Sequence, residues 1–298
     1  QFVDGQALAP TEFGSFDATS GIWKIKTACY TTPGTNGFCM KMEDSSNLDL
    51  DSSSNALTMT TVGTGTATKD NPSNNFATLN KVATQSNIGN SVTFSDGNTT
   101  VTNTGGGGWQ PVISSLGASK GKWYAEFYLS SQPTAGKLAI LDVSQYSERV
   151  NFADTSRGYS YEYLSAAVNN GNWTQSYGPT FTTNAYIQIA MDLDNMKLYF
   201  GNGGTWVNSG DPESGATGTG THPYFGGASN SANATDVDTY GFAIGLHNSS
   251  VTQANFGNGY FGTTTAGTET DASGIGLFKY EVPDGYNCLC TKNIITYG

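Results

Sequence analysis

Acidic residues with the spacing of a metal or turn motif stand out first in this sequence. Asp192 and Asp194 flank Leu193 and resemble the start of a calcium loop. An EF-hand would continue with a third ligand, a glycine and a distal glutamate. Here alternating apolar residues follow instead, so turn formation is the simpler interpretation. Calcium in the loops at 211–213 or 236–238 stays open as an alternative, and we otherwise expect no metal and no cofactor.

Two further patterns could indicate catalysis. Glu126 and Glu162 both lie in expected strands, and a glycosidase needs two carboxylates in one cleft. They do not form the closely spaced Glu-x-Asp-x-x-Glu run of lectin-like glucanases. Residues 117–121 match the Gly-x-Ser-x-Gly nucleophile motif in letters, but that motif needs a helix after the serine, and here a strand is expected. We therefore predict that the protein is not an enzyme, with a lectin-fold glycoside hydrolase as a minor alternative.

A group of aromatic residues surrounds one expected turn and is our candidate ligand site. Exposed rings beside amide side chains can hold sugars, because the rings stack on the sugar and the amides form hydrogen bonds. The competing interpretation is that alternating tyrosines are half-buried strand positions. The group consists of Tyr159, Tyr161, Tyr163, Trp173 and Tyr177.

Composition limits the classes of partner. The 298 residues carry a net charge of −11, with 13 Lys and Arg against 24 Asp and Glu, and no basic run. Nucleic-acid backbones are held by clustered basic side chains, and anionic membranes also attract basic surfaces. No apolar run approaches the ~20 residues that span a bilayer. We therefore expect neither a nucleic-acid nor a membrane partner.

We expect the candidate acidic and aromatic residues to lie mainly on β-strands. Charged residues make up only 12% of the chain, whereas glycine, at 38 residues, is frequent and punctuates short apolar segments. This pattern predicts an all-β fold, an antiparallel β-sandwich with little helix. Expected strands cover residues 122–129, 137–143, 159–168, 185–193, 196–200, 239–246, 252–256, 275–280 and 286–291. A glycine-rich loop at 208–234 is long enough to carry function.

The N-terminal region differs from the rest. Residues 1–80 contain only short apolar segments, so we expect an extended arm that packs on neighbouring subunits, with the sandwich at 81–298. Strand addition to a neighbour is one way to bury such segments. The residues expected to be buried in this assembly are Ile22, Trp23, Ile25 and Phe38.

Four cysteines leave the redox state open. Cys29 and Cys39 flank a Pro-Gly turn and would pair if the flanking segments form a hairpin. Cys288 and Cys290 alternate on an expected strand and are too far apart for an easy disulfide. We favour thiols for all four, with one Cys29–Cys39 disulfide as the alternative.

Several segments resemble the SPRY family, and more closely the SPRY-like, concanavalin A-like sandwiches in structural proteins of tailed bacteriophages. The resemblance covers about residues 75–298 and departs at the hairpin turn, where the usual Asn-Gly is Asn195-Met196. Upstream segments at 2–8, 21–24 and 35–38 resemble the last strand and linker of a laminin-G-like lectin domain in the same phage proteins. The SPRY-like segments are 121–127, 190–200 with Trp206, 255–257 and 282–290.

This resemblance implies a jelly-roll sandwich and a structural role in a virion. No ligand-contacting residue is fixed across the family, so it implies no binding site. We expect an exposed appendage, tail-fibre or capsid-surface subunit, located on the particle, that contacts copies of itself, other virion proteins and a host-surface glycan. The alternative is a carbohydrate-binding, lectin-like module of a secreted or cell-surface protein.

Overall fold

The computed structural model describes residues 1–19, 21–44, 46–63, 69–72, 74–82, 92–105, 109–132, 135–143, 158–170, 173–174, 177–214, 221–222, 225 and 238–298. The chain forms two compact units. The N-terminal unit comprises residues 1–76 together with residues 290–296. Residues 290–296 were expected to belong to the sandwich. The sandwich unit comprises residues 77–289 and 297–298.

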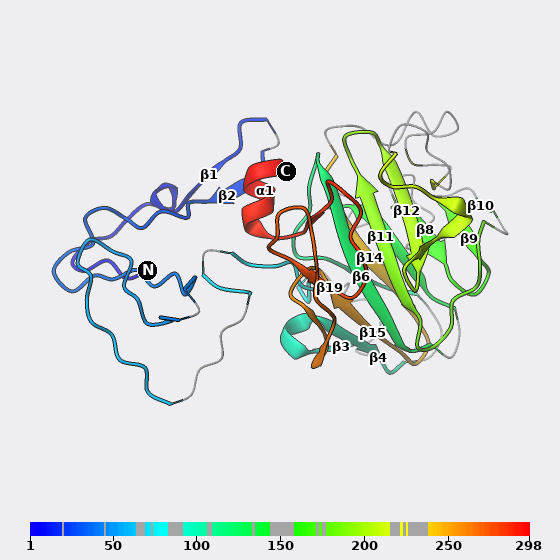
Figure 1. Cartoon of the computed structure of the whole chain (residues 1–298), viewed down its shortest axis with the longest axis horizontal. Helices are drawn as coiled ribbons and strands as arrows, with labels where there is room; N and C mark the ends of the chain where they lie inside the picture. Colours follow the sequence, from blue (N-terminus) through cyan, green and yellow to red (C-terminus); the bar gives the residue numbers. More distant parts are fainter. Residues whose placement is uncertain are drawn as a thin grey trace. The chain divides into compact units, whose positions relative to one another are not determined.

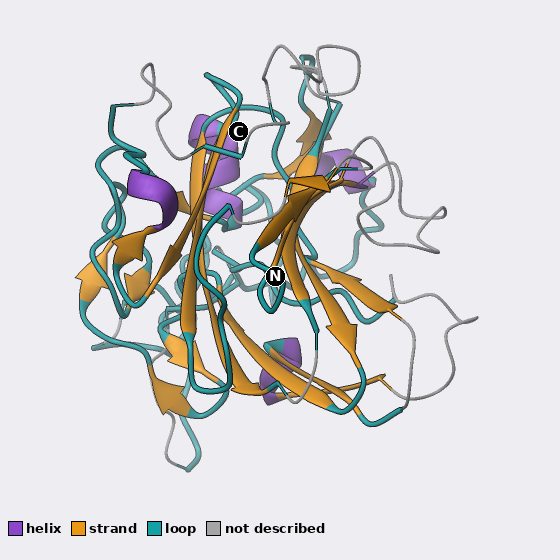
Figure 2. Cartoon of the chain, turned by 90° about the vertical axis from the view of Figure 1, so that its right-hand side faces the viewer, coloured by secondary structure: helices purple, strands orange, loops and turns teal. Residues whose placement is uncertain are grey.

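The sandwich unit is built from two large, mainly antiparallel sheets, which Figure 2 shows as two layers of strands. The predicted all-β sandwich is therefore confirmed. One sheet has the order β10 (Trp173–Thr174), β9 (Ala167–Asn169), β8 (Gly158–Glu162), β7 (Lys137–Asp142), β14 (Tyr240–His247) and β5 (Trp109–Ile113). The other has the order β13 (Thr205–Trp206), β12 (Lys197–Asn202), β11 (Tyr186–Asp192), β6 (Lys122–Ser131), β15 (Ser250–Asn255), β4 (Thr100–Asn103) and β3 (Val92–Ser95), with β20 (Asn287–Cys288) parallel to β6 (Figure 1).

Smaller elements complete the described part of the chain. The sandwich unit adds two-stranded pairs, β16 (Tyr260–Phe261) with β17 (Thr264–Thr265) and β18 (Glu269–Thr270) with β19 (Leu277–Phe278), and the 3-10 turns η3 (Asp96–Asn98) and η5 (Val207–Ser209). The N-terminal unit contains η1 (Pro10–Glu12), the paired strands β1 (Gly14–Phe16) and β2 (Trp23–Ile25), and most of α1 (Thr291–Tyr297). The helices that the structure describes are all too short or too polar to cross a bilayer.

Alternation along β6 divides its side chains between two environments, as expected for a strand. Phe127 faces the opposite sheet, and its ring centroid lies 6.5 Å from that of Phe242 and 5.9 Å from that of Phe256. Tyr124 faces the other way and meets Phe278, with 4.9 Å between the ring centroids. The outer face of this sheet is thus partly covered by the chain's own C-terminal segment.

The predicted hairpin at 185–200 is confirmed as β11 and β12, whose register pairs Asp192 with Lys197. Met196 adopts a positive φ of 52° in its turn, the conformation for which glycine is usual. Three predicted strands need correction. The expected strand 275–280 shrinks to β19, which covers only Leu277–Phe278 and pairs with β18. The segment 159–168 is split into β8 and β9 by a turn in which Ala166 has a φ of 54°. The expected strand 286–291 shrinks to β20, because the polar residues 291–293 end the apolar alternation and begin α1.

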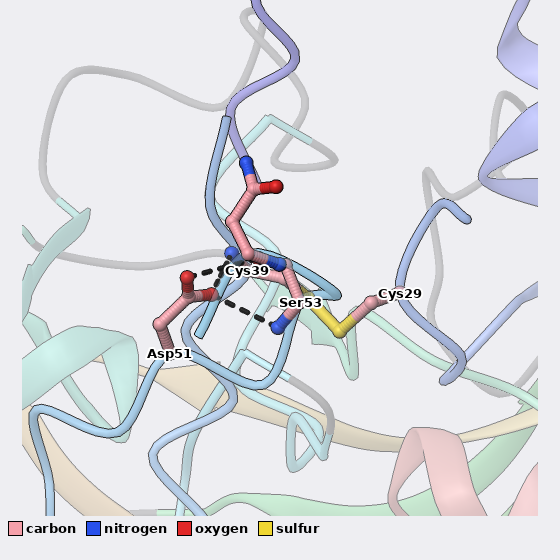
Figure 3. Close-up of a disulfide and its surroundings, with 5 residues drawn as sticks. Cys29, Cys39, Asp51 and Ser53 are labelled. Carbon is pink, nitrogen blue, oxygen red and sulfur yellow. Dashed lines mark hydrogen bonds between the residues drawn. A yellow bond between two sulfur atoms is a disulfide. The ribbon is translucent and has the colours of Figure 1, made fainter. Parts of the chain in front are cut away.

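The N-terminal unit contains a disulfide between Cys29 and Cys39, which corrects our preference for thiols at these two positions (Figure 3). The turn between them brings their Cα atoms to 6.0 Å, which is within disulfide range. Cys288 and Cys290 are buried and form no disulfide, as expected. The disulfide closes a loop over a sequence separation of 10 residues.

The carboxylate of Asp51, which lies beside the disulfide in Figure 3, supports the same segment through four hydrogen bonds. Its carboxylate accepts from the backbone N–H of Cys39 and of Ser53 at 2.9 Å each, from that of Leu57 at 2.8 Å, and from the Ser53 hydroxyl at 2.9 Å. Burial acts to raise the pKa of Asp51, but these donors outweigh it and lower the pKa from 3.8 to about 2. The segment is therefore organised around one ionised, 4% exposed carboxylate.

Most apolar side chains in residues 1–75 are exposed or half-buried. Among the described residues of 1–75, the only buried apolar side chains are those of Pro33 and Cys39. Phe16 is 70% exposed and Trp23 is 37% exposed, and their ring centroids lie 5.0 Å apart. Phe38 is half-buried beside Phe2, which is 47% exposed. Ile22 and Ile25 are half-buried.

Candidate functional site

The four tyrosines of the aromatic group predicted to bind a ligand lie inside the sandwich. Tyr159, Tyr161 and Tyr163 are at most 1% exposed and Tyr177 is 8% exposed, so the expected exposed platform is not found at these residues. The backbone of Trp173 lies in β10, but its side chain is outside the described part of the structure.

Each of these tyrosines has partners in the core. The Tyr161 ring stacks on that of Phe181 at 4.8 Å between centroids. The Tyr163 hydroxyl donates to Gln132 Oε1 at 2.6 Å, and the Gln132 amide donates to the Thr252 hydroxyl at 3.0 Å. Burial raises the pKa of Tyr163, so its hydroxyl stays protonated and serves as a structural donor.

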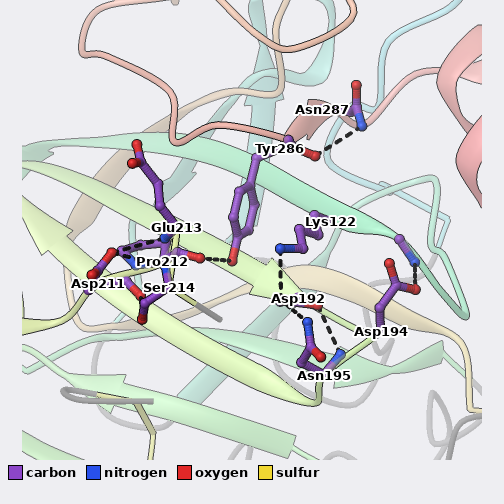
Figure 4. Close-up of polar contacts among 12 residues, drawn as sticks. Lys122, Asp192, Asp194, Asn195, Asp211, Pro212, Glu213, Ser214, Tyr286 and Asn287 are labelled. Atoms are coloured by element: carbon purple, nitrogen blue, oxygen red, sulfur yellow. Dashed lines mark hydrogen bonds and ion pairs between the residues drawn. The ribbon is translucent and has the colours of Figure 1, made fainter. Parts of the chain in front are cut away.

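Asp192 and Asp194 form turn contacts, as the simpler interpretation predicted (Figure 4). Asp192 accepts hydrogen bonds from the backbone N–H of Asn195 at 3.0 Å and from its side-chain amide at 2.8 Å. It also forms an ion pair with Lys122 at 3.3 Å. Asp194 accepts from the backbone N–H of Gly121 at 2.8 Å and so joins the hairpin turn to the start of β6.

The other acidic loops also have structural partners. Asp211 Oδ1 accepts from the backbone N–H of Glu213 and of Ser214 at 3.1 Å each, and the Tyr286 hydroxyl donates to the Pro212 carbonyl at 3.3 Å (Figure 4). In the loop at 236–238 only Asp238 is described, and it accepts from the Tyr240 hydroxyl. Most of the loop at 208–234 lies outside the described residues. In the part that the structure describes, no three ligating side chains gather as a metal site would require.

The carboxylates considered for catalysis do not lie on one sheet. Glu126 is in β6 of the eight-stranded sheet, whereas Glu162 is in β8 of the six-stranded sheet. The serine of the 117–121 motif, Ser119, is followed by strand β6 and not by a helix. His222 is buried, and burial lowers its pKa to about 3, so its ring is neutral at neutral pH.

Glu126 is fully buried on the outer face of its sheet and anchors the C-terminal segment. Its carboxylate accepts from the backbone N–H of Lys279 at 2.9 Å and of Tyr280 at 2.9 Å. The Tyr124 hydroxyl donates to it at 3.1 Å and the Asn255 amide at 3.4 Å. Burial raises the pKa of Glu126 despite these donors. The sequence placed Glu126 only in an expected strand, and its anchoring role could not be predicted because its main donors lie 153 and 154 residues away.

Beside this anchor, a row of side chains crosses the outer face of the eight-stranded sheet. The register pairs Tyr128 with Gln253 on one side and with Tyr186 on the other. The two tyrosine rings are stacked, with 4.5 Å between centroids, and both are half-buried. The Tyr128 hydroxyl donates to Asn184 Oδ1 at 2.8 Å. The row therefore offers an ordered, partly exposed aromatic strip bordered by an amide.

Lys279 and Tyr280 complete this surface, because Glu126 holds their backbone against the sheet. The Lys279 ammonium lies 4.8 Å from the centroid of the Tyr186 ring and 5.6 Å from that of the Tyr280 ring. The Tyr186 and Tyr280 rings are 6.1 Å apart. A side chain at Gly204 would have its Cβ 2.9 Å from the Tyr280 ring, so glycine at this position leaves room for that ring. We call Tyr128, Tyr186, Gln253, Lys279 and Tyr280 the tyrosine–lysine surface.

Several polar groups of this surface are not used within the described structure. The Lys279 ammonium forms no ion pair with a described residue, and the hydroxyls of Tyr186 and Tyr280 and the Gln253 amide form no hydrogen bond with one. Burial raises the pKa of both Tyr186 and Tyr280, so both hydroxyls stay protonated and able to donate. The surface thus combines rings, a cation and neutral polar groups in one place.

No protein-family model matches the chain, and no curated protein matches its sequence. Among solved structures, the chain is similar to the SPRY domain of human HERC1, at 15% sequence identity and a TM-score of 0.44. The match covers 59% of this chain and 96% of that one. The assignment to the β-sandwich class stands on the two sheets themselves, and no ligand is carried over from this likeness.

Proposed function

We propose that this chain is a non-enzymatic structural protein on the exterior of a virion. In this proposal the sandwich unit recognises the host surface, and the N-terminal unit joins the chain to copies of itself and to other virion proteins. On the basis of the sequence resemblance, we propose more specifically a tailed-bacteriophage protein. In it, a SPRY-like sandwich follows the end of a laminin-G-like lectin domain.

The observation that carries the proposal is the exposure of aromatic side chains in the N-terminal unit. Phe16 and Trp23 lie on the two-stranded pair β1 and β2, and such an isolated pair is at best marginally stable in water. Burial of these rings against another subunit would remove apolar surface from water and stabilise the pair. Ile22, Ile25 and Phe38 are half-buried in the same unit and would extend the contact.

The described acids support a role without catalysis. Asp192, Asp194, Asp211 and Glu126 each accept hydrogen bonds that hold a turn or a neighbouring segment. A carboxylate that is engaged in this way is poorly placed to exchange protons with a substrate, since catalytic acids and bases must reach the reacting atom. The contacts of these four carboxylates therefore favour a role in recognition over a role in bond cleavage.

Light scattering on the full chain tests the assembly role. We expect an oligomer for the unmodified chain and a smaller species for the double variant Phe16→Ser/Trp23→Ser. Val62→Ser is the matched control, because Val62 is 96% exposed in the same unit and lies outside the strand pair. A monomeric unmodified chain, or an oligomer that the double variant leaves unchanged, would contradict the proposal.

A carbohydrate-binding, lectin-like module of a secreted or cell-surface protein is the second candidate. The tyrosine–lysine surface favours it, because rings beside polar groups suit sugars. The two candidates differ in location. An antibody to the sandwich unit should label the outside of purified virus particles if the first is correct, and should label no particle if the second is.

A further inference from the structure

We propose that the tyrosine–lysine surface binds an acidic sugar, in which a carboxylate meets Lys279 and a sugar ring lies against the tyrosines. This inference rests on the recognition role proposed above and names the ligand class. It uses residues other than those of the predicted aromatic group at 159–177.

The aromatic part of the surface determines the kind of molecule. One face of the Tyr186 ring meets Tyr128, whereas Tyr280 stands at 67° to Tyr186 and belongs to a separate segment. Together with Phe261, whose ring centroid lies 5.1 Å from that of Tyr186, these rings form one continuous aromatic strip. A sugar presents both an apolar C–H face and hydroxyls. It can therefore use the rings together with the Tyr186 and Tyr280 hydroxyls and the Gln253 amide, which have no hydrogen-bond partner among the described residues.

The charge at the surface determines which sugars fit. Lys279 brings one ammonium between two rings, without a carboxylate partner among the described residues. An ammonium that meets a ligand carboxylate forms a charge-assisted hydrogen bond, which is stronger than a neutral one. The single ammonium of Lys279 suits a ligand with one carboxylate per contacting sugar, because the net charge of −11 on the chain disfavours densely charged anions. Densely charged polymers, such as sulfated glycans or nucleic acids, require clustered basic residues.

The buried anchor explains why the site is ordered before a ligand arrives. Glu126 holds the backbone N–H groups of Lys279 and Tyr280, and Asn255 donates both to Glu126 and to the Leu277 carbonyl at 2.9 Å. The ammonium and the Tyr280 ring are thus presented from a fixed backbone. A fixed backbone reduces the conformational entropy lost on binding.

Titration calorimetry of the full chain tests the inference. The probes are trimers of galacturonic, mannuronic and guluronic acid and 3′-sialyllactose, each also as its methyl ester, which keeps the sugar but removes the charge. We expect at least one acid to bind with a Kd below about 1 mM, and its ester to bind about tenfold more weakly. Lys279→Gln should weaken the acid about tenfold and leave the ester unchanged, because only the charge-assisted contact is lost.

Two controls separate a lost contact from a lost fold. Lys120→Gln makes the same charge change at an exposed lysine outside the surface and should bind like the unmodified chain. Lys279→Gln keeps the backbone N–H that Glu126 accepts from, so its thermal unfolding should match that of the unmodified chain. Tyr280→Phe removes one hydroxyl and should weaken acid and ester equally.

The inference is overturned if no acidic probe binds at this concentration, if esters bind as well as acids, or if Lys279→Gln and Lys120→Gln behave alike. Binding of heparin that survives Lys279→Gln would equally overturn it, since it would show general attraction to polyanions. A chain that oligomerises through its N-terminal unit but binds no acidic sugar would contradict this inference and would still support the assembly role.

Discussion

The two units of this chain are stabilised in different ways. The sandwich unit buries whole aromatic side chains between and outside its sheets, including Trp123, Tyr124 and Phe127 at 0% exposure. The N-terminal unit instead relies on the Cys29–Cys39 disulfide and on the hydrogen bonds of Asp51, while rings such as Phe16 stay exposed. A disulfide limits the freedom of the unfolded chain, whereas apolar burial drives folding directly.

This difference suggests that the two units have different roles. A unit with its own apolar core can hold side chains in fixed positions, which a binding surface requires. A unit that keeps apolar rings on its surface has area available for other subunits. The predictions below test whether the two units are stabilised as differently as their contacts indicate.

The largest effect is expected in the core of the sandwich. Phe127→Ala should lower the free energy of unfolding by about 3–5 kcal/mol, because it opens a cavity beside Phe242 and Phe256. Phe16→Ala, in the N-terminal unit, should change it by about 0.5 kcal/mol or less. Denaturant titration followed by tryptophan fluorescence measures both, and equal losses would remove the contrast between the units.

Removal of the disulfide should act on the N-terminal unit alone. We expect Cys29→Ser/Cys39→Ser to destabilise that unit by about 2–3 kcal/mol, through the added freedom of the unfolded loop. Hydrogen exchange should then accelerate in peptides that cover residues 38–57. Peptides from β6 serve as the internal control, and faster exchange there as well would show that the units do not behave independently.

Replacement of the buried anchor should have a smaller effect. Glu126→Gln replaces one acceptor oxygen by a donor, so the backbone N–H groups of Lys279 and Tyr280 and the Asn255 amide must share the one remaining acceptor oxygen. Burial of the original charge offsets part of this loss, and we expect a net cost of about 1–2 kcal/mol. Glu162→Gln is the matched control, with an expected change near zero. If the two variants have the same stability, Glu126 does not hold the C-terminal segment.

The smallest effect concerns pH. The pKa of Asp51 is about 2 in the folded chain, below its ordinary value of 3.8, so the folded state favours the ionised form. Its contribution to stability is therefore complete above about pH 4 and is lost as the pH falls through about 2. The protection factors of the Cys39 and Leu57 amides, which correct for the intrinsic exchange rate at each pH, should fall over this interval. Asp51→Asn should remove the pH dependence, and a variant that kept it would show that another group is responsible.

The sequence was sufficient for the strands but not for the faces they present. Alternation identified β6 and the β11–β12 hairpin because alternate residues of these strands enter the core. The same alternation could not separate buried from exposed tyrosines, because the C-terminal segment covers part of the outer face as well. Tyr124 and Tyr161 are therefore both buried, although their rings lie on different sheets.

The candidate surface was missed for a related reason. Its residues come from four segments, and nothing near Tyr128 in sequence shows that Lys279 will lie beside Tyr186. The available signal was the run Tyr124, Glu126, Tyr128, which places polar and aromatic groups on one strand face. The disulfide was likewise left open, since spacing alone does not show whether the intervening turn brings the two cysteines within reach.

A crystal structure of the full chain with the tightest-binding acidic oligosaccharide tests the central claim most directly. The account predicts the ligand carboxylate within about 3 Å of the Lys279 ammonium, with a sugar ring against Tyr280 or Tyr186. A sugar seated elsewhere on the chain, or one whose glycosidic bond lies between two carboxylates, would contradict it.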